Sequence, residues 1–236
     1  MQKNHEKPLI SIIIPCYNAA RFLPTALASV QQQQGGDRLF DTELILIDDG
    51  STDDTEQVVA QYPIVHYIKQ SNKGPAAARN HGIRLAQGTF IAFLDADDQW
   101  ASDTLQTLLQ GFHEHPDCQI AGGQVSYIFA EPALAKYYAL EQGKGRFVHI
   151  GSRLYRRTVF NSVGFFDEQF AYSEDLDFYN RVADAGIPVT TSAGTVLYYF
   201  VHGQNTSVQK SSITMEVMKV IRKTLQRRRE THRISK

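Results

Sequence analysis

A run of five apolar residues that ends in three aspartates constrains the fold of this sequence more than any other segment. Phe90 to Leu94 is short and entirely apolar, which is typical of a strand buried on both faces of a parallel sheet. Asp95, Asp97 and Asp98 follow it directly. Ligands of open α/β sheets bind at the carboxyl ends of the strands, and acidic groups spaced in this way suit a hard divalent cation. The segment therefore predicts an enzyme that acts on a phosphate-bearing substrate.

The first hundred residues alternate between short apolar runs and amphipathic segments. This order of strands and helices predicts an α/β fold with a mainly parallel, Rossmann-like sheet, right-handed crossovers and flanking helices. Ser51 or Thr52 is expected to cap the second helix, and Pro75 to start the third. Strands are expected at residues 9–14, 43–47, 64–69 and 90–94, and helices at residues 21–33, 51–60 and 74–86.

Beyond Trp100 the pattern is less regular. Ser102 is expected to cap a helix that ends near Glu114, and residues 131–145 are expected to form a loop. Further strands are expected at residues 120–129 and 147–155, with one or two more within 189–201, and further helices at residues 174–185 and from 212 onward.

The sequence contains no clear linker between independent domains. We therefore expect one domain over residues 1–205, with a nucleotide-binding half at about 8–98 and an acceptor half at 99–205. Residues 206–236 are expected to form a basic helical tail.

Composition excludes several other classes of protein. A net charge of −1 gives no global excess that would attract nucleic acid. The apolar runs are far shorter than the roughly 20 residues of a membrane-spanning helix. Cys16 and Cys118 are distant in the sequence, so they suit a reducing cytosol and form neither a disulfide framework nor a zinc pattern. A cytoplasmic protein is expected.

Two other strand ends carry side chains that could contact a nucleotide. Tyr17 follows Pro15 and Cys16 at the end of the first strand, where an aromatic ring can stack on a base, although packing within the protein is the commoner role of a single tyrosine. Asp48 and Asp49 end the second strand, where a carboxylate can accept a hydrogen bond from a base imide or a ribose hydroxyl.

Arg79 and the aspartates after residue 94 are expected to meet at the same edge. Arg79 could hold a phosphate or brace the aspartates, and a solvated surface arginine is the alternative. Strand alternation would point Asp95 and Asp97 to one side and turn Ala96 away. Mg²⁺ or Mn²⁺ bound with a diphosphate would offset the repulsion between the acids and neutralise charge on the leaving group.

Together and in order, these segments resemble glycosyltransferase family 2, whose members have the GT-A fold. The resemblance covers about residues 8–205. It rests on residues 11–18, 43–55, 74–82 and 90–98, and on residues 164–168 and 173–181.

The resemblance implies roles for individual residues on the donor side. Tyr17 matches the residue that stacks on the donor base, Asp49 matches the aspartate that contacts the base, and Arg79 matches an arginine near the nucleotide. The full set expected at the donor nucleotide is Pro15, Tyr17, Asp48, Asp49, Arg79, Asp95 and Ala96.

The resemblance also implies a metal site and a catalytic base. Asp97 matches the metal-coordinating aspartate, with Asp95 and, more loosely, His202 beside it. Asp175 matches the catalytic base of inverting members, which contributes roughly a hundred- to ten-thousandfold to the rate. Glu174 beside it is expected to raise its pKa or to brace the loop. Without the resemblance, these two acids are simply favourable charges at a helix N-terminus.

The implied activity is the transfer of a sugar, with inversion, from a nucleotide-diphosphate donor to a hydroxyl acceptor. A UDP-sugar is the expected donor, a saccharide or lipid-linked molecule the expected acceptor, and Mn²⁺ or Mg²⁺ the expected cofactor. Family analogy indicates cell-surface polysaccharide, lipopolysaccharide or glycolipid synthesis. The alternatives are a non-catalytic nucleotide- or glycan-binding protein of the same fold and a nucleotidyltransferase. The absence of glycine and lysine from residues 15–20 argues against the latter.

The basic tail has two interpretations. Met218, Ile221 and Leu225 recur at helical spacing among many lysines and arginines, and such a helix can lie on an anionic membrane surface. Alternatively, the tail is a solvated helix that packs on the domain through this apolar stripe.

Overall fold

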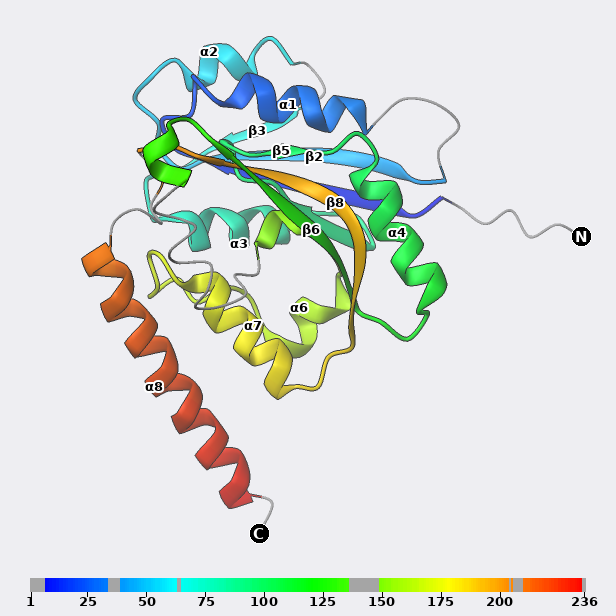
Figure 1. The fold of residues 1–236 in the computed structure, drawn as a ribbon, viewed down its shortest axis with the longest axis vertical. Coiled ribbons are helices and arrows are strands. Elements are labelled where there is room, and N and C mark those ends of the chain that lie inside the picture. Colours follow the sequence, from blue (N-terminus) through cyan, green and yellow to red (C-terminus); the bar gives the residue numbers. More distant parts are fainter. Residues whose placement is uncertain are drawn as a thin grey trace, which may run out of the picture.

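The protein is built around one eight-stranded sheet with the strand order β3-β2-β1-β4-β7-β6-β8-β5 (Figure 1). The computed structural model describes residues 7–33, 39–62, 65–135, 149–203, 205 and 210–234. The expected positions Ile64 and Phe147, and residues 136–145 of the predicted loop at 131–145, lie outside the described residues.

The first half of the chain supplies four parallel strands. β1 (Leu9–Cys16) lies between β2 (Asp41–Asp48) and β4 (Phe90–Phe93), and β3 (Val65–Lys69) continues the sheet beyond β2. All eight residues of β1 pair with β2, from Leu9 with Asp41 to Cys16 with Asp48. The parallel sheet and all four predicted strands are thereby confirmed.

Helices cover both faces of the sheet, because alternate residues of β1 point to opposite sides. Ile12 and Ile14 belong to an apolar cluster with residues of α1 (Leu23–Gln32) and α4 (Thr104–Glu114). Ile13 belongs to a second cluster on the other face, where α3 (Pro75–Leu85), α6 (Thr158–Val163) and α7 (Glu174–Asp184) pack.

The second half extends the sheet with strands of both directions. β7 (Arg153–Arg156) is antiparallel to β4 and β6, while β6 (Ile120–Phe129) runs parallel to the long β8 (Val189–Val201). β5 (Gln99–Trp100) adds an antiparallel edge on β8, and the short 3-10 helix η1 (Ile150–Ser152) precedes β7. The segment 189–201 is thus a single strand.

Several sequence predictions about helices are wrong. α2 (Thr55–Val59) begins after Ser51 and Thr52, so neither residue caps it. α4 begins at Thr104 with Asp103 as its N-cap residue, so Ser102 does not cap it either. Residues 132–135 are helical where a loop was expected, and α6 and β5 were not expected at all.

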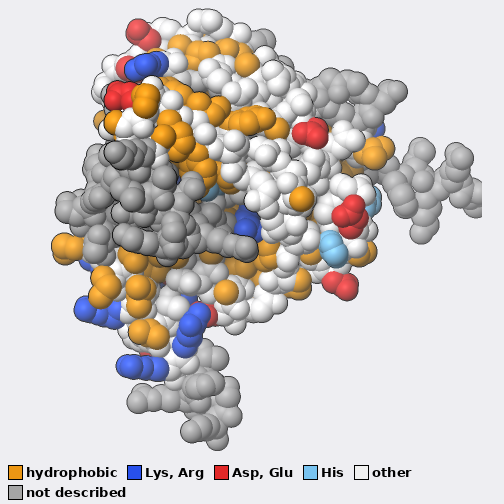
Figure 2. All heavy atoms as spheres, viewed as in Figure 1, with side chains coloured by type: hydrophobic (Ala, Val, Ile, Leu, Met, Phe, Trp, Pro, Cys, Tyr) orange, Lys and Arg blue, Asp and Glu red, His pale blue; other side chains and the backbone are white. Residues whose placement is uncertain are grey.

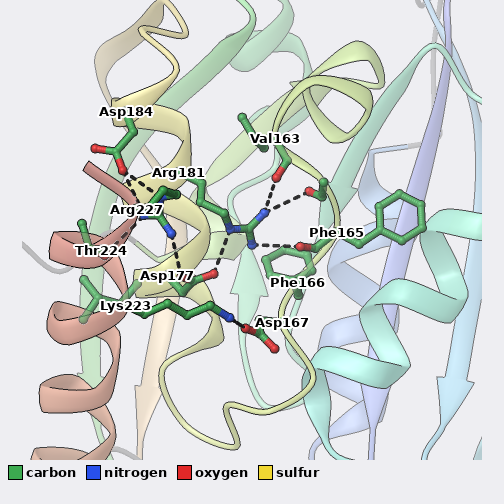
Figure 3. Close-up of polar contacts among 12 residues, drawn as sticks. Val163, Phe165, Phe166, Asp167, Asp177, Arg181, Asp184, Lys223, Thr224 and Arg227 are labelled. Carbon is green, nitrogen blue, oxygen red and sulfur yellow. Dashed lines mark hydrogen bonds and ion pairs between the residues drawn. The ribbon is translucent and has the colours of Figure 1, made fainter. Parts of the chain in front are cut away.

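A long C-terminal helix, α8 (Lys210–Ile234), packs against α7. Arg227 pairs with Asp184 at 3.0 Å and with Asp177 at 3.6 Å, and Lys223 pairs with Asp167 in the loop before α7 (Figure 3). Arg181 of α7 contacts the same Asp177 at 2.8 Å. These contacts hold α7, its preceding loop and α8 together.

Met218, Ile221 and Leu225 of α8 are exposed. The expectation that α8 packs on the domain through this stripe is therefore wrong, since its buried residues include Val220 and Thr224 instead. Among the residues that the structure describes, no helix combines the length and the apolar character needed to cross a membrane.

Candidate active site

The carboxyl end of β1 presents an aromatic side chain to solvent. Tyr17 is 53% exposed, directly after the buried Pro15 and Cys16. Asn18 adopts a left-handed φ of 50°, which asparagine tolerates better than most residues. Its N–H donates to Ser51 Oγ at 2.8 Å, and its Oδ1 accepts the N–H of Thr52 at 2.8 Å. These hydrogen bonds hold the turns after β1 and β2 together. The exposed Tyr17 ring beside them is accessible to a ligand.

Asp48 is a buried carboxylate at the end of β2. It accepts hydrogen bonds from Tyr67 Oη at 2.5 Å and from the N–H of Ser51 at 2.7 Å. Burial, and next the negative charge of Asp48, raise the pKa of the Cys16 thiol, which excludes a reactive thiolate there. Asp48 therefore stabilises the turn that follows β2, at the carboxyl edge of the sheet.

Asp49 organises the loop that leads into α3. It accepts the N–H of Gly74 at 2.7 Å, the N–H of Lys73 at 2.9 Å and the Nε2 amide of Gln70 at 2.8 Å. Gly74 has a φ of 90°, which glycine adopts without strain. Asp49 lies at the expected edge, and its predicted contact with the donor base stays a prediction.

Arg79 connects the two halves of the site. Its Nη2 donates to Asp95 Oδ1 at 2.6 Å, and its Nη1 donates to Glu174 Oε1. Its side chain is only 6% exposed, so the alternative of a solvated surface arginine is wrong. Although burial disfavours the charged form, the two carboxylates hold the pKa of Arg79 above its usual value.

Glu174 and Asp175 lie in the first turn of α7, and Glu174 binds the same guanidinium group as Asp95. Burial raises the pKa of Glu174, and the charge of Arg79 opposes that rise. Burial, followed by repulsion from Glu174, raises the pKa of Asp175 to about 7. A carboxylate with this pKa can take up a proton near neutral pH and is suited to general-base chemistry.

The segment after β4 is a turn rather than a continued strand. The N–H of Asp98 donates to the carbonyl oxygen of Asp95 at 3.0 Å, so strand alternation does not decide where these side chains point. Ala96 packs in the core. Asp98 is buried, and its Oδ1 accepts the N–H of Phe200 in β8 at 3.0 Å. Burial, and then the charge of Asp97, raise the pKa of Asp98, which favours a structural role for this acid.

Asp97 meets His202 across the sheet. Asp97 Oδ2 lies 3.0 Å from His202 Nε2 and accepts the Nδ2 amide of Asn205 at 3.1 Å. The His202 ring stacks on Phe22 with a centroid distance of 4.5 Å and an interplanar angle of 17°. The loose sequence match of His202 to the site thus corresponds to a direct contact with Asp97.

These residues fit part of a divalent-cation site. A carboxylate oxygen of Asp97 and the Nε2 nitrogen of His202 lie side by side, within hydrogen-bonding distance at 3.0 Å. Carboxylate oxygen and neutral imidazole nitrogen are both suitable donors for Mn²⁺. The described residues contain no group of three or more histidines, cysteines and acids arranged around one point. A cation would therefore need ligands from substrate and water, as Mg²⁺ and similar ions often do at phosphate sites.

Sequence reasoning missed two parts of this region. Asn205 donates its side-chain amide to Asp97, and the sequence analysis did not identify it as a site residue. His149 showed no pattern, but its Nε2 lies 2.8 Å from Tyr127 Oη and its ring lies against Tyr199. Burial lowers the pKa of His149 to about 4, against the opposing effect of Asp95. No local signal could reveal these contacts, because they join segments far apart in the chain.

Comparison with known proteins supports the same interpretation of the sequence. The family model described as Glycosyl transferase family 2 matches residues 11–173. Chondroitin synthase of Escherichia coli is 29% identical over 93% of this chain and 33% of its own length. The minor teichoic acid biosynthesis protein GgaA of Bacillus subtilis is 32% identical over 74% of this chain and 43% of its own length. The chain therefore spans less than half of either relative.

Solved structures share the architecture. The mannosyltransferase PcManGT of Pyrobaculum calidifontis, in complex with GDP-Man and Mn²⁺, has a TM-score of 0.72 and 20% identity, covering 94% of this chain and 65% of that one. S. aureus TarS 1-349 in complex with UDP has a TM-score of 0.66 and 21% identity, covering 81% of this chain and 60% of that one. The predicted fold class is thereby confirmed.

Proposed function

Because the chain belongs to glycosyl transferase family 2 and has the GT-A fold, we propose that it transfers a sugar from a nucleotide-diphosphate donor to a hydroxyl acceptor. The observation that carries this proposal is the Arg79 bridge between Asp95 and Glu174. Through it, the acidic turn after β4 and the acid pair that starts α7 meet at one place. A donor held at the turn would present its reacting carbon toward Asp175.

Asp175 is the proposed base of an inverting displacement. Its carboxylate takes the proton of the acceptor hydroxyl while the acceptor oxygen bonds to the anomeric carbon and the bond from that carbon to the diphosphate oxygen breaks. The raised pKa of about 7 lets Asp175 be ionised before the step and hold the proton after it. Glu174 contributes by repulsion, and Arg79 limits that contribution by pairing with it.

Tyr17 and the β2 end are the proposed contacts of the donor base. The exposed Tyr17 ring can stack on it, while Asp48 and Asp49 hold the rim beside it. The named neighbours were solved with UDP, UDP-GlcNAc and GDP-Man, so both uracil and guanine are accepted by proteins of this fold. We favour a UDP-sugar for this chain.

A divalent cation, Mn²⁺ or Mg²⁺, is the proposed cofactor. Asp97 and His202 would hold it, with Asp95 as the further acid predicted nearby. Such an ion neutralises negative charge that develops on a departing diphosphate. Asn205 and Phe22 keep Asp97 and the imidazole in place.

The acceptor is proposed to be a saccharide or lipid-linked molecule of the cell surface. Relatives named for chondroitin synthesis and for teichoic acid biosynthesis support this setting. We propose that the protein acts in the cytoplasm on nucleotide-sugar donors. Contact of its basic C-terminal helix with the membrane surface is compatible with this location.

The test of the base is the pair Asp175→Asn and Glu174→Gln, assayed for transfer across a pH series with UDP-sugars. Asp175→Asn is expected to lower kcat by a hundred- to ten-thousandfold while calorimetry shows unchanged donor binding. The acidic limb of kcat/KM should lie near pH 7, since Asp175 must be ionised. Glu174→Gln removes a negative neighbour, which lowers the pKa of Asp175 and moves this limb to lower pH.

Asp103→Asn, an exposed acid at the start of α4, is the matched control and should leave the pH profile unchanged. Full turnover by Asp175→Asn would remove the base role. Donor binding without transfer or donor hydrolysis by the unaltered protein, across a panel of acceptors, would favour the alternative of a non-catalytic binding protein that retains the fold.

A further inference from the structure

The outward face of α8 is both apolar and basic. Met215, Met218 and Leu225 are between 48% and 67% exposed, and Ile221 beside them is 44% exposed. Arg222 and Arg229 are exposed as well. Residues spaced by three and four positions share one side of a helix, so these side chains form one continuous stripe. The stripe comprises Met215, Met218, Ile221, Arg222, Leu225 and Arg229.

The acids of α8 do not lie on this stripe. Glu216 points toward the domain, where its oxygens accept the N–H groups of Ala171 at 3.1 Å and Tyr172 at 2.7 Å. Glu230 accepts the side-chain amide of Gln226 at 3.0 Å on the flank of the helix. The stripe is therefore positive as well as apolar. Figure 2 shows the same mixture of orange and blue side chains at the lower end of the molecule, where Figure 1 places α8.

The opposite side of α8 holds it on the domain. Val220 and Thr224 are buried, and Arg227 and Arg228 pair with Asp184 of α7. These residues follow the same spacing on the other side of the helix. The fold thus orients the helix and keeps its apolar and basic side outward.

We propose that this stripe docks α8 on the surface of an anionic phospholipid bilayer. The chemistry matches that of a helix lying in the interface: apolar side chains enter the boundary between head groups and acyl chains, and arginines pair with lipid phosphates. The long arginine side chains can extend to the phosphates while their methylene groups cover apolar surface. This docking does not depend on the transfer activity proposed above.

The docked orientation would bring the candidate active site close to the lipid. Glu216 of α8 binds the backbone immediately before Ser173, which precedes the Glu174–Asp175 pair. In Figure 1, α8 starts on the side of the molecule toward which β1 runs. A bilayer along the stripe would therefore be separated by α8 from the segment that leads into the Glu174–Asp175 pair.

The experiment is co-sedimentation of the full chain with vesicles of phosphatidylcholine alone and of phosphatidylcholine with about 30 mol % phosphatidylglycerol, at about 0.1 M salt. Binding is expected with the anionic vesicles and should weaken as salt rises. Arg222→Gln with Arg229→Gln should reduce the partition coefficient about thirtyfold, because each arginine near the surface contributes about fivefold. Leu225→Glu should reduce it as well.

Matched controls lie elsewhere on the surface. Lys69→Gln with Arg84→Gln removes the same charge from exposed positions on β3 and α3, and Leu85→Glu introduces the same acid at an exposed leucine. Both controls should bind like the unaltered chain. Circular dichroism checks that every variant is folded.

Three results would overturn the proposal. They are equal binding to neutral and anionic vesicles, equal loss in the stripe and control variants, and absence of vesicle binding. In the last case, a concentration-dependent dimer abolished by Leu225→Glu would identify a second copy as the partner of the stripe.

Discussion

Replacing Arg79 by methionine tests the central connection of the site through protein stability, without any assumption about substrates. Arg79 and Glu174 have side chains that are only 6% and 8% exposed, so the substitution leaves a buried carboxylate without its cation. Breaking a buried ion pair in this way costs about 3–5 kcal/mol. Asp95 is about one-third exposed, so solvent screens its share, and we expect the lower half of that range.

The sign of the pH dependence follows from Glu174. Its pKa in the folded protein is already raised by burial, and Arg79 opposes that rise. Arg79→Met raises it further, so the folded variant binds a proton that the unfolded chain releases. Stability of the variant therefore falls as pH rises from the unfolded pKa of glutamate toward the raised folded one, at about 1.4 kcal/mol for each unit between the two values.

Urea unfolding at pH 5 and pH 7.5 measures both effects. The loss caused by Arg79→Met should be larger at the higher pH, and adding Glu174→Gln should remove most of this difference. Lys223→Met is the control, because Lys223 pairs with Asp167 at the surface, where such pairs contribute about 0–1 kcal/mol. If Arg79→Met cost no more than Lys223→Met, or cost the same at both pH values, the assignment of a buried charge bridge would be refuted.

Two further substitutions test the packing of α3 and the proposed cation site. Gly82→Ala would place a Cβ only 2.4 Å from Ile13 Cγ2 in the core and should lower the free energy of unfolding by about 1–3 kcal/mol. Gly111→Ala, whose Cβ would have its nearest contacts at 3.2 Å, should lower it by less. Urea unfolding compares the two variants, and equal losses would contradict the close approach of α3 to β1. His202→Gln should weaken Mn²⁺ binding more than about tenfold in titration calorimetry, while the exposed His66→Gln should not, and unchanged affinity would exclude His202 as a ligand.

The first half of the fold was predictable because its signals are local. The apolar runs of β1, β2 and β4 are buried. α1 and α2 begin seven residues after the ends of β1 and β2, at Leu23 and Thr55. The starts of helices were less predictable. Ser51 does not cap α2, because its Oγ accepts the N–H of Asn18 and its own N–H donates to Asp48 Oδ1. The hydroxyl was equally available for either use, and the tertiary structure decided between them.

The second half depends on contacts between distant segments. β5 has only two residues and exists because Gln99 pairs with Tyr198 of β8. Trp100 then anchors this edge by donating its indole N–H to the carbonyl oxygen of Gly151 at 2.8 Å. No periodicity can predict a two-residue strand, and for the same reason the neighbours of His149 were not foreseen.

The residue types of the site were predictable, but the pairing that gives them different properties was not. Hydroxyl and N–H groups satisfy the acids at the end of β2, and Arg79 neutralises the carboxylates on either side of it. Asp97 has His202 as its partner. Asp175 accepts a hydrogen bond from the backbone N–H of its neighbour Leu176, at 2.6 Å. Asp175 is half-buried, lies beside another acid and pairs with no cation among the residues that the structure describes, so its pKa is raised, as a base acting near neutral pH requires. The distribution of counter-charges therefore gives different properties to acids that the sequence presents as alike, and it leaves Asp175 with a pKa of about 7.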